Sequence, residues 1–176
     1  LVELVLDASV VVALLVRDSP MDIPNAVLDA IDDGAMVTVP PHFQLEVANF
    51  LVQAQRRGTL SASGAQQALR YLQHLPITVD TPMHTQIFTD VIAIAQRNGI
   101  TSYDAAYIHC ARTRGARLAS LDKQLLAAAT AEGVEVLLGH RAVHLVRNDD
   151  HDVVGLEVHV GKRTELVGAR QAVIFG

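Results

Sequence analysis

Near its amino end the chain reads Leu4-Val5-Leu6-Asp7-Ala8-Ser9-Val10-Val11-Val12-Ala13-Leu14-Leu15, two apolar runs joined through a carboxylate, a small residue and a hydroxyl. The first run is too short for anything but a buried strand, and we expect a helix after it. In an α/β sheet the carboxyl end of a parallel strand faces the crevice where ligands bind. Burying an aspartate there is costly unless the carboxylate is paired or bound to a metal. Asp7 is therefore a candidate functional residue, with capping of the following helix by Asp7 or Ser9 as the alternative.

Short strands and helices alternate along residues 1–138. This alternation predicts an α/β fold with a parallel sheet that is covered on both faces. We expect further strands at 36–39, 77–79, 117–122 and 134–138, and helices that begin near Pro24, Phe43, Ser61, Met83, Thr101 and Lys123.

The helix that begins at Phe43 has a predicted inner face and a predicted polar face. Leu45, Ala48 and Val52 are expected to point inward. Glu46 and Asn49 lie three residues apart, so they share a face of the helix.

The composition limits the class of protein. A chain of 176 residues of which 50% are hydrophobic predicts one globular domain, with room for an appendage. Its apolar stretches are shorter than the roughly 18 residues of a membrane span, and no basic region precedes the first, so we expect neither a membrane segment nor a secretory signal. The single cysteine, Cys110, excludes an internal disulfide and fits a reducing compartment, which makes a cytoplasmic location the expectation.

The net charge of -5 argues against a generally basic nucleic-acid binder. It does not exclude a nuclease, because a metal site concentrates negative charge that cations then neutralise. The acidic excess lies within residues 1–138, whereas residues 139–176 carry equal numbers of acidic and basic residues. Any RNA would need cations around the site, and the candidates are Arg56, Arg57, Arg112, Arg114, Arg117 and Lys123, for each of which a solvated surface position is the simpler interpretation.

Four acids are placed so that they can meet. Asp7 and Asp122 follow short strands, and Glu46 and Asp104 stand near the starts of helices. Helices that leave one edge of a parallel sheet start beside the strand ends, so all four carboxylates can converge on one crevice. Such a cluster is stable only with protons or cations in it, and hard oxygen ligands suit Mg²⁺ or Mn²⁺. For each acid a helix-capping or helix-dipole role is the alternative.

A divalent ion at this position would have a defined chemistry. It would lower the pKa of a water molecule and stabilise charge at phosphorus, as phosphodiester hydrolysis requires. Ser9 and Ser120 are placed to hydrogen-bond water or a scissile phosphate, and Asn49 is placed to orient a carboxylate. The eight histidines show no zinc-type spacing with cysteine, and we expect His109 and Cys110 to be packing residues.

The acids and their neighbours resemble the four motifs of PIN-domain ribonucleases, specifically the VapC-type toxins. The motifs are Leu4-Val5-Leu6-Asp7-Ala8-Ser9, Glu46 with Asn49, Thr101-Ser102-Tyr103-Asp104-Ala105-Ala106-Tyr107, and Leu118-Ala119-Ser120-Leu121-Asp122, in the order and spacing of that group over residues 1–138. The segment Tyr-Asp-Ala-Ala-Tyr is quite specific within it.

The resemblance implies a fold, an activity and partners. The fold is a PIN-like α/β/α sandwich with a central parallel sheet. The activity is that of a Mg²⁺- or Mn²⁺-dependent endoribonuclease, the toxin of a type II toxin–antitoxin pair, in which a metal-activated water attacks an RNA phosphodiester without a covalent intermediate. The partners are a second copy of the chain and a small antitoxin protein. Carried over residue by residue, Asp7, Glu46, Asp104 and Asp122 become metal ligands, and Ser9, Asn49 and Ser120 become supporting polar groups.

Residues 139–176 depart from this pattern. Two alternating segments, 142–146 and 153–160, are separated by the turn at 148–152, and after a turn at Gly161-Lys162 we expect a closing strand at 172–175. This pattern predicts a C-terminal antiparallel β-meander as a β-rich extension. The segment resembles a piece of an FAD-dependent dehydrogenase of the fumarate reductase type, but the chain lacks the Gly-rich dinucleotide fingerprint, so we predict no flavin. A small meander is marginal alone, so we expect it to pack on the first domain or to pair with a second chain.

Other functions remain open from the residues alone. A haloacid-dehalogenase-type phosphatase requires a second aspartate two residues after the first, and Ser9 occupies that position. A receiver domain requires a pair of acids and a late lysine that the chain does not supply convincingly. A catalytically silent PIN-like module that binds RNA or protein is the non-enzymatic alternative. Metal titration combined with a cleavage assay separates these functions.

Overall fold

The computed structural model describes residues 2–16, 22–82, 85, 87–137, 140–147, 153–160 and 163–168. The chain forms two compact units, Leu1–Leu137 and Leu138–Gly176. Among the residues described, no helix is both long enough and apolar enough to cross a membrane.

The first unit is built on a parallel four-stranded sheet, as the alternation of elements predicts. Its strands are β1 (Glu3–Leu6), β2 (Met36–Val39), β3 (Ile77–Val79) and β4 (Arg117–Ala119), in the order β3-β2-β1-β4. The chain moves from β1 outward to β3 and then returns to the other side of β1 with β4. The order of the strands therefore reverses at β1, and in open parallel sheets ligands bind at such a point.

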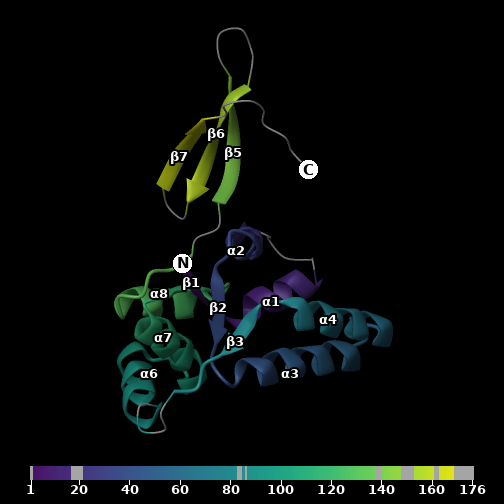
Figure 1. Ribbon diagram of the computed structural model, residues 1–176, viewed down its shortest axis with the longest axis vertical. Helices are drawn as coiled ribbons and strands as arrows, with labels where there is room; N and C mark the ends of the chain where they lie inside the picture. Colours follow the sequence, from purple (N-terminus) through teal and green to yellow (C-terminus); the bar gives the residue numbers. More distant parts are fainter. Residues whose placement is uncertain are drawn as a thin grey trace. The chain divides into compact units, whose positions relative to one another are not determined.

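Helices cover both faces of this sheet (Figure 1). One layer contains α1 (Ala8–Val16), α3 (Phe43–Arg56) and α4 (Ala62–His74), and the other contains α6 (Ile92–Asn98), α7 (Ser102–Arg114) and α8 (Lys123–Ala131). Helix α2 (Asp22–Asp32) contacts α1, and a π-helical turn, η1 (Ile87–Val91), leads into α6.

Local sequence signals set several helix ends. Ser61 and Thr101 cap α4 and α7 through their hydroxyl groups, as Ser and Thr do at helix starts. Gly115 ends α7 in the left-handed conformation, with φ 62°, which turns the chain towards β4. The segment Arg17-Asp18-Ser19-Pro20, whose composition is typical of a helix break, lies outside the described residues. The predicted strand at 134–138 is reduced to one bridge between Leu118 and Val136.

The core is centred on β1. Leu4, Val5 and Leu6 are fully buried or nearly so, because this strand has neighbours on both edges and helices on both faces. Tyr107 and Ile108 of α7 are also fully buried in this core.

The predicted inner face of α3 was wrong. Phe43, Val47, Leu51 and Ala54 are buried, whereas Leu45 is 73% exposed and both Ala48 and Val52 are exposed or largely so. The buried residues keep a spacing of three and four residues, but they start two positions earlier than predicted. Nearly every residue of this helix is apolar or uncharged, so periodicity alone did not distinguish the two faces.

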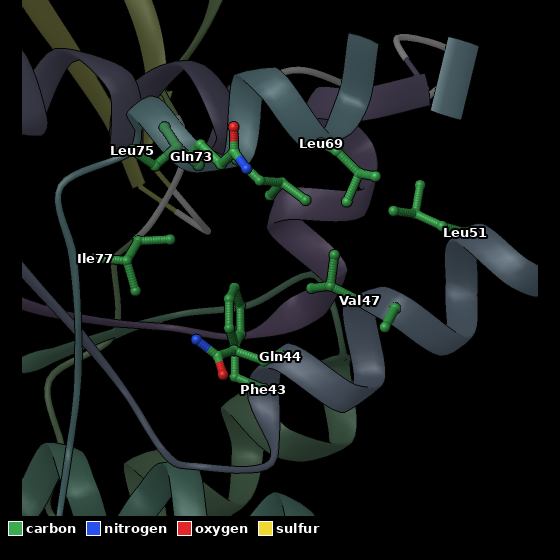
Figure 2. A pocket seen from close by; sticks show the side chains of 10 residues that line it. Phe43, Gln44, Val47, Leu51, Leu69, Gln73, Leu75 and Ile77 are labelled. Carbon is green, nitrogen blue, oxygen red and sulfur yellow. The ribbon is translucent and has the colours of Figure 1, made fainter. Parts of the chain in front are cut away.

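A cavity of about 380 Å³ separates α3 from α4. Figure 2 shows side chains from α3, α4 and the segment leading into β3 pointing into it. Its lining is mainly apolar and consists of Phe43, Gln44, Val47, Ala48, Leu51, Leu69, Leu72, Gln73, Leu75 and Ile77. None of these described lining residues is an acid.

The second unit contains an antiparallel sheet of three strands, β5 (His140–Arg147), β6 (Val153–Val160) and β7 (Arg163–Gly168), in that order. The pairing of β5 with β6 is shifted at two points, between Ala142 and His144 and between Val146 and Arg147. The sequence did not predict β7, and the strand expected at 172–175 lies outside the described residues.

Candidate active site

Asp7 lies directly after β1, at the carboxyl edge of the sheet. Its backbone N–H donates to the carbonyl of Ala119 at 3.0 Å, which extends the pairing of β1 with β4 by one residue. This bond fixes the aspartate beside Ser120, the residue after β4. The Asp7 side chain is almost fully enclosed, with 8% of the residue exposed.

Two hydroxyl groups hold the Asp7 carboxylate. Ser120 donates to Oδ2 at 2.7 Å, and Ser9, in the first turn of α1, donates to the same oxygen. Burial raises the pKa of Asp7, although these hydrogen bonds oppose the shift. Backbone N–H groups of Ala8 and Ser9 also oppose the shift, yet burial outweighs all of these hydrogen bonds, so a cation would satisfy the buried charge better.

The loop between β4 and α8 connects Asp122 to the same network. The N–H of Asp122 donates to the Ser120 hydroxyl at 2.9 Å, and the N–H of Leu121 donates to the Ser9 hydroxyl at 3.0 Å. The Asp122 carboxylate caps α8 by accepting from the N–H groups of Gln124 and Leu125. The capping role considered for this acid is therefore real, and it holds Asp122 two residues from a serine that contacts Asp7.

Glu46 enters from α3. Tyr107, which α7 buries in the core, donates its hydroxyl proton to Oε2 of Glu46 at 2.5 Å. The Nε2 atom of His42 lies 3.7 Å from the same oxygen, one helical turn before Glu46. Burial raises the pKa of Tyr107, and the bond to Glu46 raises it further, so this phenol remains a hydrogen-bond donor.

Asp104 stands in the first turn of α7. Its backbone N–H donates to the Thr101 hydroxyl at 3.1 Å, and the Thr101 hydroxyl donates to Oδ2 of Asp104 at 2.7 Å. This reciprocal pair caps the helix and fixes the carboxylate at the helix start.

The charges of three of the predicted acids affect the pKa of one histidine, His42. Burial lowers the pKa of His42, whereas the charges of Glu46, Asp104 and Asp7 oppose that shift. Asp7 after β1, Glu46 of α3 and Asp104 of α7 are thus close enough to His42 for their charges to affect its pKa, and Ser120 links the backbone N–H of Asp122 to the Asp7 carboxylate. Asn49, by contrast, is exposed on α3.

The donor set fits a hard divalent cation in chemical type, because it offers carboxylate oxygens with a buried, poorly compensated Asp7 among them. Within the part of the chain that the structure describes, no three His, Cys, Asp or Glu side chains are grouped so as to hold a metal ion. Glu46 is turned towards Tyr107 and Asp122 towards the start of α8. The assignment of these acids as metal ligands therefore stays a prediction.

Sequence reasoning missed His42 and Tyr107 as parts of this site. The spacing of His42 and Glu46, one helical turn apart, was a signal for the first. Tyr107 stands one helical turn after Tyr103 and closes the Tyr-Asp-Ala-Ala-Tyr segment, but only the fold shows that its hydroxyl reaches Glu46.

Two of the candidate RNA-contacting cations are already paired. Arg112 binds Glu132 at 3.1 Å, and Arg114 binds both Asp80 and Glu3. Both arginines thus stabilise contacts between elements of the fold. The prediction of RNA contact is therefore less well supported for these two arginines than for the remaining candidates, which are Arg56, Arg57, Arg117 and Lys123.

His109 and Cys110 are buried in α7, as predicted for packing residues. Burial raises the pKa of the Cys110 thiol to about 12, with Asp80 adding to the shift. A thiol with so high a pKa stays protonated near neutral pH and is a poor nucleophile.

The chain is similar to several known proteins. Ribonuclease VapC3 of Pyrobaculum aerophilum is 30% identical over 123 residues, which span 70% of this chain and 92% of that protein. Ribonuclease VapC3 of Mycobacterium tuberculosis is 33% identical over 123 residues, or 70% and 85% of the two chains. The crystal structure of PAE2754 from Pyrobaculum aerophilum has a TM-score of 0.53 and 25% identity, over 72% of this chain and 86% of that one. The sequence pattern that defines the PIN domain family matches residues 4–131 of this chain, and the chain therefore belongs to that family.

Proposed function

We propose that this chain is a divalent-metal-dependent endoribonuclease, the toxin of a type II toxin–antitoxin pair. The observation that supports this most is the buried Asp7 at the carboxyl end of β1, held by Ser9 and Ser120, in the same unit as a Glu46 carboxylate that Tyr107 holds. The similarity to two proteins named as VapC ribonucleases supports the RNA substrate.

In this proposal Asp7, Glu46, Asp104 and Asp122 hold Mg²⁺ or Mn²⁺. The cation would supply an activated water and would neutralise charge that develops on the phosphate. Ser9 and Ser120 fix the Asp7 carboxylate, and Tyr107 fixes that of Glu46. Asn49 is exposed on α3, and Glu46 is the acid of that helix whose carboxylate it would orient. Among the supporting residues, the structure defines the role of Asn49 least.

The partners follow from the resemblance to VapC-type toxins. We propose a homodimer, a small antitoxin protein that inhibits the enzyme, and a cytoplasmic location. We also propose that residues 139–176 form a separate β-rich extension without a flavin, so that the purified protein is colourless.

The direct test is RNA cleavage by the purified protein. Cleavage is expected with Mn²⁺ or Mg²⁺, and it is expected to be lost with EDTA and in the Asp7→Asn variant. Asp33→Asn, at an exposed turn, is the matched control and is expected to cleave like the wild type. Equal cleavage by wild type, by wild type in EDTA and by Asp7→Asn would show that the activity comes from a contaminant.

A catalytically silent RNA-binding module is the second candidate. The observation that favours it is the lack of a ready-made group of three ligands among the described residues. Thermal unfolding during a Mn²⁺ titration separates the two. A rise in Tm that Asp7→Asn abolishes supports the enzyme, and RNA binding without such a rise supports the silent module.

A further inference from the structure

Tyr103 is an aromatic residue exposed to solvent at the edge of the acid site. It is 61% exposed and directly precedes Asp104 in the first turn of α7. The helix start is fixed by the bonds between Thr101 and Asp104, so the backbone that carries the ring is fixed as well.

The Tyr103 ring is linked to Glu46 through other aromatic rings. Its centroid lies 5.4 Å from that of His42, and the His42 ring lies 5.1 Å from that of Tyr107 in an edge-on arrangement. Tyr107 donates to Glu46. Tyr103 thus contacts the partly buried ring of His42, which in turn contacts the buried ring of Tyr107 beside Glu46, while most of Tyr103 faces solvent.

The charge of the site limits how RNA can be held there. Asp7, Glu46 and Asp104 repel phosphate groups except where a cation neutralises them. Arg112 and Arg114 lie in the last turn of α7, at the opposite end of that helix from Asp104, and both are engaged in ion pairs. A neutral contact with the face of a base avoids this repulsion, and aromatic side chains provide such a contact for single-stranded RNA.

We propose that Tyr103 is the stacking platform for the base next to the scissile phosphate, an inference that rests on the proposed ribonuclease function. Stacking on Tyr103 places that nucleotide beside Asp104 and Glu46. Because every base has an aromatic face, this contact tolerates different sequences and contributes mainly to substrate binding.

The test measures binding of a short fluorescein-labelled single-stranded RNA of mixed sequence. Ca²⁺ replaces Mg²⁺ or Mn²⁺ to suppress hydrolysis, and a gel of the same samples verifies that the RNA is intact. Tyr103→Ala and Tyr103→Leu are expected to weaken binding about tenfold, the scale of one lost base stack. Tyr103→Phe keeps the ring and is expected to bind like the wild type. Tyr71→Ala, at a half-exposed tyrosine of α4, is the matched control.

Abasic substitution in the RNA distinguishes stacking from a structural effect. One position of the RNA is expected to weaken wild-type binding about tenfold when its base is removed, with no further loss in Tyr103→Ala. In cleavage assays Tyr103→Ala is expected to lower kcat/KM about tenfold, and Tyr103→Phe is expected to keep the wild-type value.

Three results would overturn the inference. They are unchanged RNA binding by Tyr103→Ala, additive losses for the variant and every abasic position, and a change in oligomeric mass without a change in RNA binding, which would assign Tyr103 to a protein interface. If the wild-type protein cleaves RNA normally in any of these cases, the proposed function still stands. Wild-type protein that neither binds nor cleaves RNA removes the function and the inference together.

Discussion

At the scale of single residues, the chemistry of the site centres on the buried carboxylate of Asp7. Asp7 accepts hydrogen bonds from two serines, yet burial still raises its pKa. The folded state therefore binds this proton more tightly than the unfolded state does. The stabilising effect of the protonated group is fully present below the ordinary value of 3.8 and is lost as the pH rises through the raised pKa.

Replacing Asp7 with asparagine should therefore stabilise the metal-free protein near neutral pH. The variant removes a desolvated charge, and each kcal/mol gained raises Tm by about 2–4 °C in a chain of this size. The difference in Tm should vanish below pH 3.8. Adding Mn²⁺ should raise the Tm of the wild type alone, because only the wild type gains a bound ion. A metal-free Asp7→Asn protein that is less stable than the wild type at pH 7 would contradict this account, and Asp33→Asn controls for surface charge.

Tyr107 offers a second prediction at this scale. Its hydroxyl donates to Glu46 from within the core, so Tyr107→Phe removes one hydrogen bond and almost no volume. Loss of a group that orients a ligand typically costs about 10- to 100-fold in metal affinity or activity. We expect the Mn²⁺ concentration that gives half-maximal cleavage to rise about tenfold, with kcat at saturating Mn²⁺ largely retained. Tyr103→Phe is the matched control, and an unchanged Mn²⁺ dependence in Tyr107→Phe would remove Tyr107 from the site.

At the scale of elements, an arginine fixes α7 against the sheet. Arg114, in the last turn of α7, donates to Glu3 of β1 and to Asp80, the residue after β3. Asp80 is almost fully buried, so its charge depends on this partner. The opposite end of α7 carries Asp104, so the ion pairs help to fix the helix that positions a proposed metal ligand.

Removing this arginine should destabilise the first unit. Arg114→Ala leaves Asp80 buried without its partner, and we expect a loss of about 1–3 kcal/mol in the free energy of unfolding, less than for a fully buried pair because Arg114 is partly exposed. Urea unfolding followed by circular dichroism measures this loss. Arg70→Ala, at an exposed position of α4, should change the free energy little. Equal effects of the two substitutions would show that the ion pairs contribute nothing.

The elements also show which features the sequence predicts and which it does not. The positions of Asp7 and Asp122 in the fold were predictable, because short apolar runs precede both, and the start of a helix near Thr101 was predictable from the sequence as well. The inner face of α3 was not, because Leu45 and Val47 are equally apolar and only packing against α1 and α4 selects Val47. The bond between Tyr107 and Glu46 joins residues 61 positions apart, so only the fold reveals it.

At the scale of the whole molecule, the first unit has a core of its own. The buried apolar cluster is formed by described residues between Leu4 and Leu137, and the four acids all lie in that unit. The sheet of β5, β6 and β7 has three strands, and a sheet of that size is at the lower limit of independent stability. The two units should therefore contribute very differently to stability and to activity.

Truncating the chain after Leu138 tests this division. A protein of residues 1–138 retains every group proposed for catalysis and the whole buried cluster, so we expect cooperative unfolding and Mn²⁺-dependent cleavage with an unchanged kcat. Light scattering on both proteins shows whether residues 139–176 contribute to self-association, since a β-meander that pairs with a second chain would be lost on truncation. Limited proteolysis of the intact chain supplies the control, because cleavage near residue 138 without loss of activity reproduces the truncation in the native protein. A truncated protein that unfolds without cooperativity would show that the second unit completes the fold of the first, and the assignment of the nuclease to residues 1–138 would then be wrong.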